Sequence, residues 1–254
     1  QPPIYSIGVK QLLKVPRENG FGDNRVMHSF GYPLPGNIFG GGIVYSLDQT
    51  TLAIGLIIGL DWPYKNFNPQ AELERFKKNP LIASFIEGHE VMESGAKVFP
   101  EGGYYSLPVP GTEDALILGD AAGFTDVARM RGLPLALGSG IAAGRAVAEH
   151  YRDKESLIGS YHRALEKEGI IADLKAARNI RQIFSTPMGV MLGMVLSPIQ
   201  HLLPPLIMHE DREAMKDRSL PYDYKAGFSR EDFVHASGTT HEENQPSHIT
   251  ILDD

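Results

Sequence analysis

The stretch LILGDAAGFTDVARMRGL, residues 116–133, carries the strongest fold signal in the chain. The apolar run 115–118 predicts a short buried strand, and Gly119-Asp120 stand where that strand would end. A glycine-rich turn follows, and a helix is predicted to begin near Pro134, because proline is favoured in a first helical turn. The stretch therefore predicts a strand, a glycine turn and a helix in direct succession.

This unit suits a flavin. Small residues allow a ligand to lie against the main chain, and Asp120 can accept hydrogen bonds from ribityl or ribose hydroxyls. The helix would present its N-terminal amides and positive dipole end to a phosphate or to the electron-rich N1–C2=O edge of a flavin. The candidate cofactor-binding residues are Gly119, Asp120, Ala121, Ala122, Gly123, Arg131, Gly132, Leu133 and Pro134. The alternative is a tight strand–helix connection with Asp120 as a cap.

The helix after the turn has a face of mostly small residues, formed by Ala136, Gly140, Ala143 and Val147. Residues at this spacing share one side of a helix, so that side could approach another backbone or a cofactor closely.

A second constellation is the run Phe39-Gly40-Gly41-Gly42, which leads into an apolar strand. Each glycine costs about 0.5–1 kcal/mol relative to alanine, which is easiest to explain where something approaches the backbone. A flat ring lying on the glycines would satisfy this condition. Taken alone, the run fits a β-bulge or a hairpin turn better.

The first hundred residues predict an antiparallel or mixed sheet with one helix. Runs rich in β-branched and aromatic residues are separated by turn residues, and they lie at Ile4–Val9, Arg25–Tyr32, Ile43–Leu47 and Leu52–Leu60. The helix is predicted from Pro69 to Lys78, with Asn79-Pro80 ending it. The segment Phe99–Pro108 is expected to be a turn between two parts of the sheet.

The last hundred residues predict helices, an apolar segment and a polar tail. Helical spacing extends from Glu155 to Phe184, with Gly169 as a break. The apolar segment 187–208 is interrupted by prolines, which leaves runs of about ten residues where about 20 are needed to cross a bilayer. Two arrangements fit this segment: it could insert into one leaflet of a membrane, or it could form a buried hairpin within the protein. The spacing of His241 and His248 in the tail matches no zinc motif, so no metal site is predicted.

Composition excludes several functions. The 254 residues are 42% apolar, which is enough for one large or two small globular domains, and the net charge of −7 argues against nucleic acid. Cysteine is absent, which removes disulfides, cysteine nucleophiles and cysteine-ligated clusters from this chain. No catalytic triad or carboxylate pair stands out. The N-terminal residues have neither a signal-peptide nor a transit-peptide layout.

In order and context, these segments resemble the electron-transfer flavoprotein:ubiquinone oxidoreductases. The similarity spans nearly the whole chain and is most specific in the tail. The matching segments are residues 4–10, 31–34, 39–41, 55–61, 76–77, 79–80, 101–103, 119–132, 177–181, 241–248 and 253–254.

The resemblance implies an α+β or α/β architecture in three parts. A quinone-binding sheet module would occupy residues 1–108. The C-terminal half of a glutathione-reductase-like FAD-binding fold would follow at 109–184. A membrane-contacting helical segment and the polar tail would complete the chain at 185–254. Phe39, Gly40, Gly41 and Gly42 would bind the quinone, and the stretch 119–132 would close over FAD.

The implied enzyme takes electrons from reduced electron-transfer flavoprotein through FAD to ubiquinone. It would lie peripherally on the matrix face of the mitochondrial inner membrane or the cytoplasmic face of a bacterial inner membrane. No side-chain acid or base is required, because the flavin passes electrons through its own ring. Its partners would be the electron-transfer flavoprotein, ubiquinone and the membrane surface.

Two departures from the family pattern bear on activity. The chain has no Gly-x-Gly-x-x-Gly motif for the ADP half of FAD and no ferredoxin-like domain. The family's [4Fe–4S] cluster is therefore expected in a whole enzyme and not on this chain, which alone should hold FAD poorly and be inactive. The missing segments would be its further partners. The alternatives are a geranylgeranyl-reductase-type flavoenzyme and a non-catalytic membrane-surface docking module.

Overall fold

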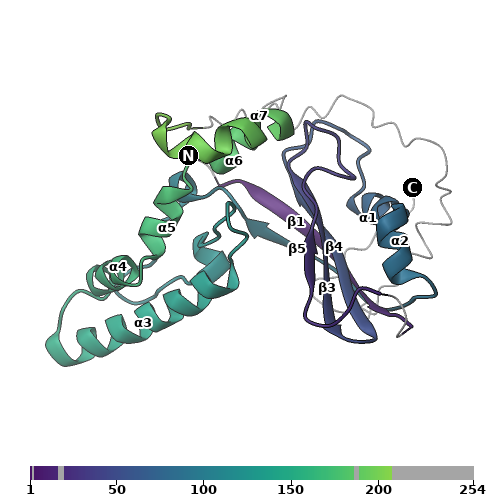
Figure 1. Ribbon diagram of the computed structural model, residues 1–254. Helices are drawn as coiled ribbons and strands as arrows, with labels where there is room; N and C mark the ends of the chain where they lie inside the picture. The colour runs from purple at the N-terminus through teal and green to yellow at the C-terminus, as the bar shows by residue number, and fades with distance from the viewer. Residues whose placement is uncertain (2, 17–19, 186–188, 208–254) are drawn as a thin grey trace, which may run out of the picture.

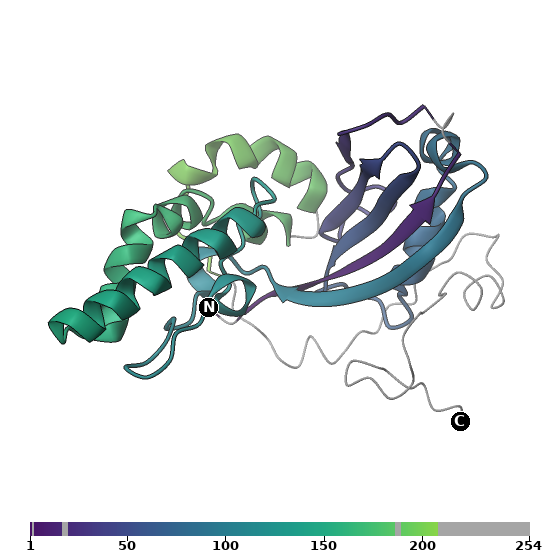
Figure 2. The same ribbon diagram turned by 90° about the horizontal axis from the view of Figure 1, so that it is seen from below.

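A computed structural model describes residues 1, 3–16, 20–185 and 189–207. It has a lobe built on a β-sheet and a lobe of helices, with α6 (Ile180–Phe184) and α7 (Gly189–Leu196) along one edge between them (Figure 1). Turned by 90°, the long strands of the sheet extend toward the helical lobe (Figure 2). The tail residues His241 and His248 lie outside the described residues.

The sheet has five strands in the order β2-β3-β4-β1-β5, and every neighbouring pair is antiparallel. The strands are β1 (Tyr5–Lys14), β2 (Val26–His28), β3 (Gly40–Asp48), β4 (Thr51–Gly59) and β5 (Glu90–Pro100). This confirms an antiparallel sheet in a mixed α/β structure. The predicted strand 25–32 is shorter than expected, and β5 was missed because its exposed, polar residues do not resemble a buried strand.

The two faces of the sheet have different roles. On one face, apolar side chains such as Val44, Ile54 and Leu56 are buried beneath α1 (Pro69–Lys77) and α2 (Pro80–Ile86). The opposite face carries small residues in β4 and β5, the strands on either side of β1. Gly55 of β4 and Gly95 of β5 both pair with Lys10 of β1 in register. The first face is the core of the sheet lobe, and the described residues leave part of the second face open.

Asparagine and proline punctuate the two helices of this lobe. The Asn68 side chain accepts hydrogen bonds from the backbone amides of Gln70 and Ala71 at the start of α1. Asn79 caps α2 in the same way, so Asn79-Pro80 ends one helix and begins another. The single helix predicted here was therefore an incomplete prediction, since a proline that stops one helix can also start the next.

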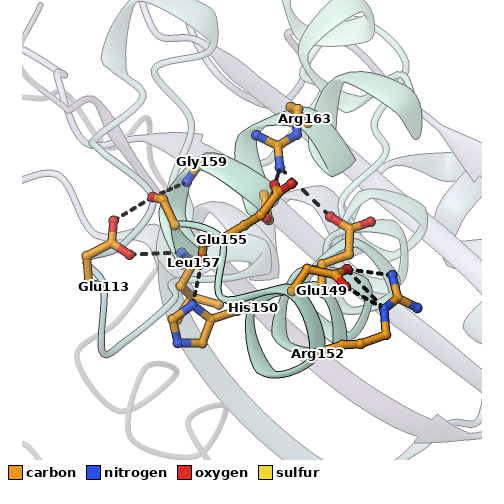
Figure 3. Close-up of polar contacts among 11 residues, drawn as sticks. Glu113, Glu149, His150, Arg152, Glu155, Leu157, Gly159 and Arg163 are labelled. Carbon is orange, nitrogen blue, oxygen red and sulfur yellow. Dashed lines mark hydrogen bonds and ion pairs between the residues drawn. The ribbon is translucent and has the colours of Figure 1, made fainter.

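The helical lobe is formed by α3 (Leu133–Asp153), α4 (Leu157–Lys167) and α5 (Ile170–Ala176), which enclose a separate apolar core. Gly169 adopts the left-handed conformation between α4 and α5, as its predicted role as a break requires. The start of α4 is capped twice (Figure 3), because Ser156 accepts from the Gly159 amide while the Glu113 carboxylate accepts from Ser156 and Leu157. The hairpin of α3 and α4 is thus held at its turn.

Two sequence predictions about this lobe were wrong. The run 115–118 is not a buried strand: Thr112 and Ala115 close a tight turn, Leu116 makes one isolated bridge to Gly111, and Ile117 is 38% exposed. On α3, the packed face is formed by Leu135, Ser139, Ala142, Ala143 and Ala146, whereas Gly140 and Val147 are exposed. Contacts with α4 and α5 selected the face, and these contacts are not visible in local spacing.

The short elements complete the fold. They are η2 (Tyr104–Ser106), η3 (Gly119–Ala122) and η4 (Ser197–Leu202). Among the described residues, no helix has the length and apolar character needed to span a membrane.

Gly42 offers a test of the sheet core. A Cβ atom there would lie 2.3 Å from the ring of Phe76 on α1. We expect Gly42→Val to lower the free energy of unfolding by about 1–3 kcal/mol, because the core would be overpacked. Denaturant unfolding followed by the fluorescence of the only tryptophan, the buried Trp62, measures this. Gly95→Val is the control, because a Cβ atom at Gly95 would have no neighbour within 4 Å among the described residues, and equal losses for the two variants would contradict the prediction.

Candidate functional site

A cavity of about 280 Å³ lies where the start of β3 meets the loop between η3 and α3. Its walls come from the edge of the sheet, the end of β5 and this loop. The lining residues are His28, Ser29, Phe30, Phe39, Gly40, Gly41, Gly42, Ile43, Ile57, Phe99, Glu101, Asp120, Thr125, Asp126, Val127, Met130 and Gly132. The cavity thus joins the two constellations that the sequence indicated.

The three glycines are required by the chain itself. A Cβ atom would lie 2.2 Å from the Ile57 carbonyl oxygen at Gly40 and 2.0 Å from the Ser29 carbonyl oxygen at Gly41. Gly40 also has a φ of 147°, which disfavours other residues. Close approach to the backbone was correctly expected, but the approaching atoms belong to the protein. A ring lying on these glycines stays a prediction.

The loop 126–131 is fixed by a buried carboxylate. Asp126 is fully buried, and it exchanges two backbone hydrogen bonds with Arg131. Arg131 Nη2 lies 3.0 Å from Asp126 and 2.8 Å from Asp173 of α5, while Arg129 also pairs with both carboxylates. Arg131 therefore holds the loop in place and does not line the cavity.

The structure brings together only part of the predicted cofactor set. Asp120 and Gly132 line the cavity with Phe39 and the three glycines. Gly119, Ala122 and Gly123 shape the turn: Gly119 and Ala122 are buried, and Gly123 is left-handed. Ala121, Leu133 and Pro134 are exposed and do not line the cavity.

Features of the cavity wall fit a flavin ring. The Thr125 hydroxyl is buried and has no hydrogen-bond partner among the described residues, so it can bond to a ligand. The helix α3 begins at the cavity wall with Gly132 as its N-cap, and its first turn contains no acidic side chain. Its amides and positive dipole end therefore remain available to an electron-rich ring edge.

Sequence reasoning missed a buried ionic cluster beside the cavity. Arg181 of α6 is 1% exposed, and its Nη2 donates to Asp61 Oδ1 at 2.8 Å. Its guanidinium carbon lies 4.3 Å from the centre of the Phe39 ring, and its Nε lies 3.8 Å from Glu101 Oε2. The resemblance had included Asp61, Glu101 and Arg181 in its matching segments 55–61, 101–103 and 177–181, but it gave these charges no role.

The two carboxyl groups of the cluster have opposite pKa shifts. Burial alone would raise the pKa of Asp61, but Arg181 and Ser185 lower it below the usual 3.8. Burial raises the pKa of Glu101 and outweighs the opposing effects of Arg181 and the Ser6 hydroxyl, which donates a hydrogen bond to it. The cluster thus combines an ionised Asp61 with a Glu101 that favours its neutral form.

No group of three or more potential metal ligands occurs within residues 1, 3–16, 20–185 and 189–207.

The fold is shared with proteins of known structure, one of which is a flavin-dependent enzyme. A geranylgeranyl bacteriochlorophyll reductase-like protein from Thermoplasma acidophilum matches with a TM-score of 0.58 and 14% identity, over 85% of this chain and 51% of that one. A flavin-dependent brominase matches with a TM-score of 0.51 and 18% identity, over 91% and 55%. These likenesses show that the chain shares the fold of these proteins.

Sequence comparison gives a more specific likeness. Residues 5–99 match the family described as ETF-QO, ubiquinone-binding. The probable mitochondrial electron transfer flavoprotein-ubiquinone oxidoreductase of Schizosaccharomyces pombe is 32% identical over 98% of this chain and 42% of its own length. Over nearly its whole length the chain is similar to electron transfer flavoprotein-ubiquinone oxidoreductases, and it spans less than half the length of the curated relatives it matches.

The ion pair of Asp61 and Arg181 predicts an acid-sensitive stability. The folded-state pKa of Asp61 is lowered, so the pair's contribution is full above pH 3.8 and is lost as the pH falls through the folded-state pKa. We expect Asp61→Asn to cost about 2 kcal/mol of unfolding free energy near neutral pH, and this difference to shrink in acid. Denaturant titrations at several pH values measure it.

Asp114→Asn, in the exposed turn of residues 112–115, provides the matched control. It removes one carboxylate without disturbing Arg181, so a similar cost in both variants would show that the buried pair has no special effect.

Proposed function

We propose that this chain is part of a flavoenzyme that passes electrons from reduced electron-transfer flavoprotein through FAD to ubiquinone. One observation carries the proposal: the ubiquinone-binding match and the predicted flavin unit contribute walls to the same cavity. Gly41 and Ile57 come from the matched residues 5–99, and Asp120 and Gly132 come from the flavin unit. A quinone and a flavin bound there would be close enough for direct electron transfer.

FAD would supply the electron transfer, and the chain would supply position and polarity. We assign to Thr125 and the start of α3 the polar edge of the flavin, and to Asp120 its hydroxylated chain. Asp120 pairs with Lys97 at 3.4 Å in a contact largely open to solvent, which a ligand could readily displace. The quinone ring would lie on the open face of the sheet beside Gly41. Quinone binding would then be the role of a module formed by residues 1–108, and flavin binding that of a module formed by residues 109–184.

We also propose that the α7–η4 segment contacts a membrane surface. Gly189 and Gly193 of α7 are buried, while large apolar side chains point outward. The exposed set on α7 and η4 is Met191, Met194, Val195, Ile199 and Leu202. Formal charges are absent between Arg181 and Glu210, so this surface could enter one leaflet without burying a charge. As part of the same proposal, the membrane-contacting segment and the polar tail form a module of residues 185–254. It would lie on the matrix face of the mitochondrial inner membrane or on the cytoplasmic face of a bacterial inner membrane.

Ile57 tests the occupant of the cavity. Its side chain lies on the open face between Gly41 and Gly8, which are its register partners in β3 and β1. In the complete flavin-loaded protein, we expect Ile57→Trp to raise the KM for a short-chain ubiquinone analogue at least tenfold, because the indole would fill the space beside Gly41. Steady-state quinone reduction, with bound flavin measured by absorbance, provides the readout.

Val26→Trp is the control, because Val26 is 61% exposed on the edge strand β2 and does not line the cavity. Unchanged quinone kinetics in Ile57→Trp with normal flavin content would contradict the quinone assignment. Reduction of a geranylgeranyl substrate but not of the quinone by the unmodified protein would contradict the proposed reaction itself.

Membrane contact is tested by flotation with vesicles of mixed zwitterionic and anionic lipid. We expect Met194→Glu to reduce the fraction that floats, because a charge would enter the apolar surface of α7, where Met194 is 62% exposed. Val26→Glu carries the same charge change on a different exposed apolar residue. Equal flotation of the two variants and the unmodified protein would remove this surface from the proposal.

A further inference from the structure

Two buried carboxyl groups share one cation beside the cavity. Asp61 receives a short hydrogen bond from Arg181 Nη2 and another from the Ser185 hydroxyl at 2.9 Å. Glu101 has a weaker contact, since its Oε2 lies 3.8 Å from Arg181 Nε, and this nitrogen has no hydrogen-bond partner among the described residues. One positive charge cannot neutralise two carboxylates, so the cluster is electrically balanced when one of them carries a proton.

The geometry indicates which carboxyl group carries the proton. Asp61 has the close, charge-assisted contacts and is partly exposed, with 26% of its side chain accessible. Glu101 is only 6% exposed, and its ionic contact with Arg181, at 3.8 Å, is longer than the 2.8 Å contact of Asp61. Its raised pKa agrees with this assignment. Glu101 is therefore the carboxyl group of the cluster that favours the protonated form.

Glu101 also faces the cavity from a fixed position. It follows directly after β5, and its backbone N–H donates to the Ile4 carbonyl oxygen at 2.6 Å. The Ser6 hydroxyl of β1 donates to its Oε2. The same residue lines the cavity that Gly40, Gly41 and Gly42 enclose from the other side. A buried acid of this kind, held at the wall of a ligand cavity, is placed to exchange a proton with the ligand.

We propose that Glu101 donates a proton to a carbonyl oxygen of the quinone reduced in this cavity. The inference rests on the proposed function and adds a side-chain acid, which the sequence had not led us to expect. Conversion of a quinone to a quinol requires two electrons and two protons. FAD in its anionic reduced form would supply the two electrons and one of the protons to the quinone. The Glu101 O–H bond breaks to supply the other proton, and solvent water later reprotonates the carboxylate.

Charged neighbours define the environment of this step. Arg181 and Asp61 face Glu101 from α6 and from the end of β4, and Ser6 faces it from β1. Asp120, Asp126 and His28 line the same cavity, and Asp126 is already paired with Arg129 and Arg131. When Glu101 loses its proton, Arg181 is the cation close enough to stabilise the new carboxylate.

The kinetic test uses the complete flavin-loaded protein and a short-chain ubiquinone analogue. We expect Glu101→Gln to slow quinol formation about 100-fold near neutral pH, because glutamine cannot donate this proton. Transfer from the reduced flavin to ferricyanide, which takes an electron without a proton, should be unchanged. The unmodified protein should lose rate as the pH rises through the pKa of Glu101, and the variant should lack this dependence. Glu93→Gln, an exposed change on the same strand outside the cavity, should behave as the unmodified protein.

A second measurement does not depend on turnover. Infrared difference spectra of the oxidised protein during a pH titration should show the carbonyl band of a protonated carboxylic acid, absent in Glu101→Gln and retained in Glu93→Gln. Glu101→Asp keeps a carboxyl group at this position and should retain a shifted band and part of the rate. It also provides the test if glutamine prevents folding.

The outcomes separate the two levels of the proposal. If the unmodified protein shows the Glu101 band but reduces no quinone, the proposed function fails and the protonated state of Glu101 stands. If it reduces quinone and Glu101→Gln does so equally fast at every pH, the proton-donor role is overturned while the proposed function stands. Absence of any band that the Glu101 variants change also overturns the inference.

Discussion

The buried guanidinium of Arg181 is the contact on which the arrangement of the two lobes depends. It belongs to α6, yet its partners lie at the ends of three strands: Phe39 before β3, Asp61 after β4 and Glu101 after β5. Gly59 leaves space for it, because a Cβ atom there would lie 2.4 Å from Arg181 Nη2. A cation that is buried so completely must keep its partners. This requirement fixes α6 against the sheet, next to Phe39 and Glu101 of the cavity wall.

The cluster contributes more to the positions of its residues than to the stability of the fold. Desolvating a charge is costly, and a buried ion pair often stabilises a fold no more than apolar residues of the same volume would. What the charges provide here is geometry: the guanidinium, the phenyl ring of Phe39 and the two carboxyl groups can meet in few arrangements. The same desolvation favours the neutral form of Glu101. Burial therefore both orders the residues of the site and raises the pKa of Glu101.

The glycine run of β3 shows how packing and function can place the same demand on a residue. Gly40 and Gly41 have no room for a side chain because Ile57 and Ser29 approach them, and Gly42 is covered by Phe76. The three glycines therefore contribute only backbone to the cavity wall, next to the side chains of Ile43 and Ile57. Packing within the chain therefore creates the platform on which we place the quinone, and no separate explanation by a ligand is needed for the glycines.

The sequence by itself determined the features that depend on a few neighbouring residues. Pro69, Asn79 and Gly169 mark helix boundaries through local hydrogen bonds and backbone preferences, and runs rich in β-branched and aromatic residues indicated the strands of the sheet. The sequence also showed the glycine turn at 119–123, the run Phe39–Gly42 and the resemblance to a known family. Local signals failed where neighbours in space decide, as in the exposed run 115–118 and the packed face of α3.

Only the tertiary structure brought the site together. Arg181 and Asp61 are 120 residues apart in the sequence, and Ser6 and Glu101 are 95 apart. Each residue alone resembles an ordinary surface charge or loop residue, because the property that matters, burial beside an opposite charge, arises only when distant segments pack. The sequence determined the parts of the cavity wall, and the fold decided which of them face one another and which carboxyl group keeps its proton.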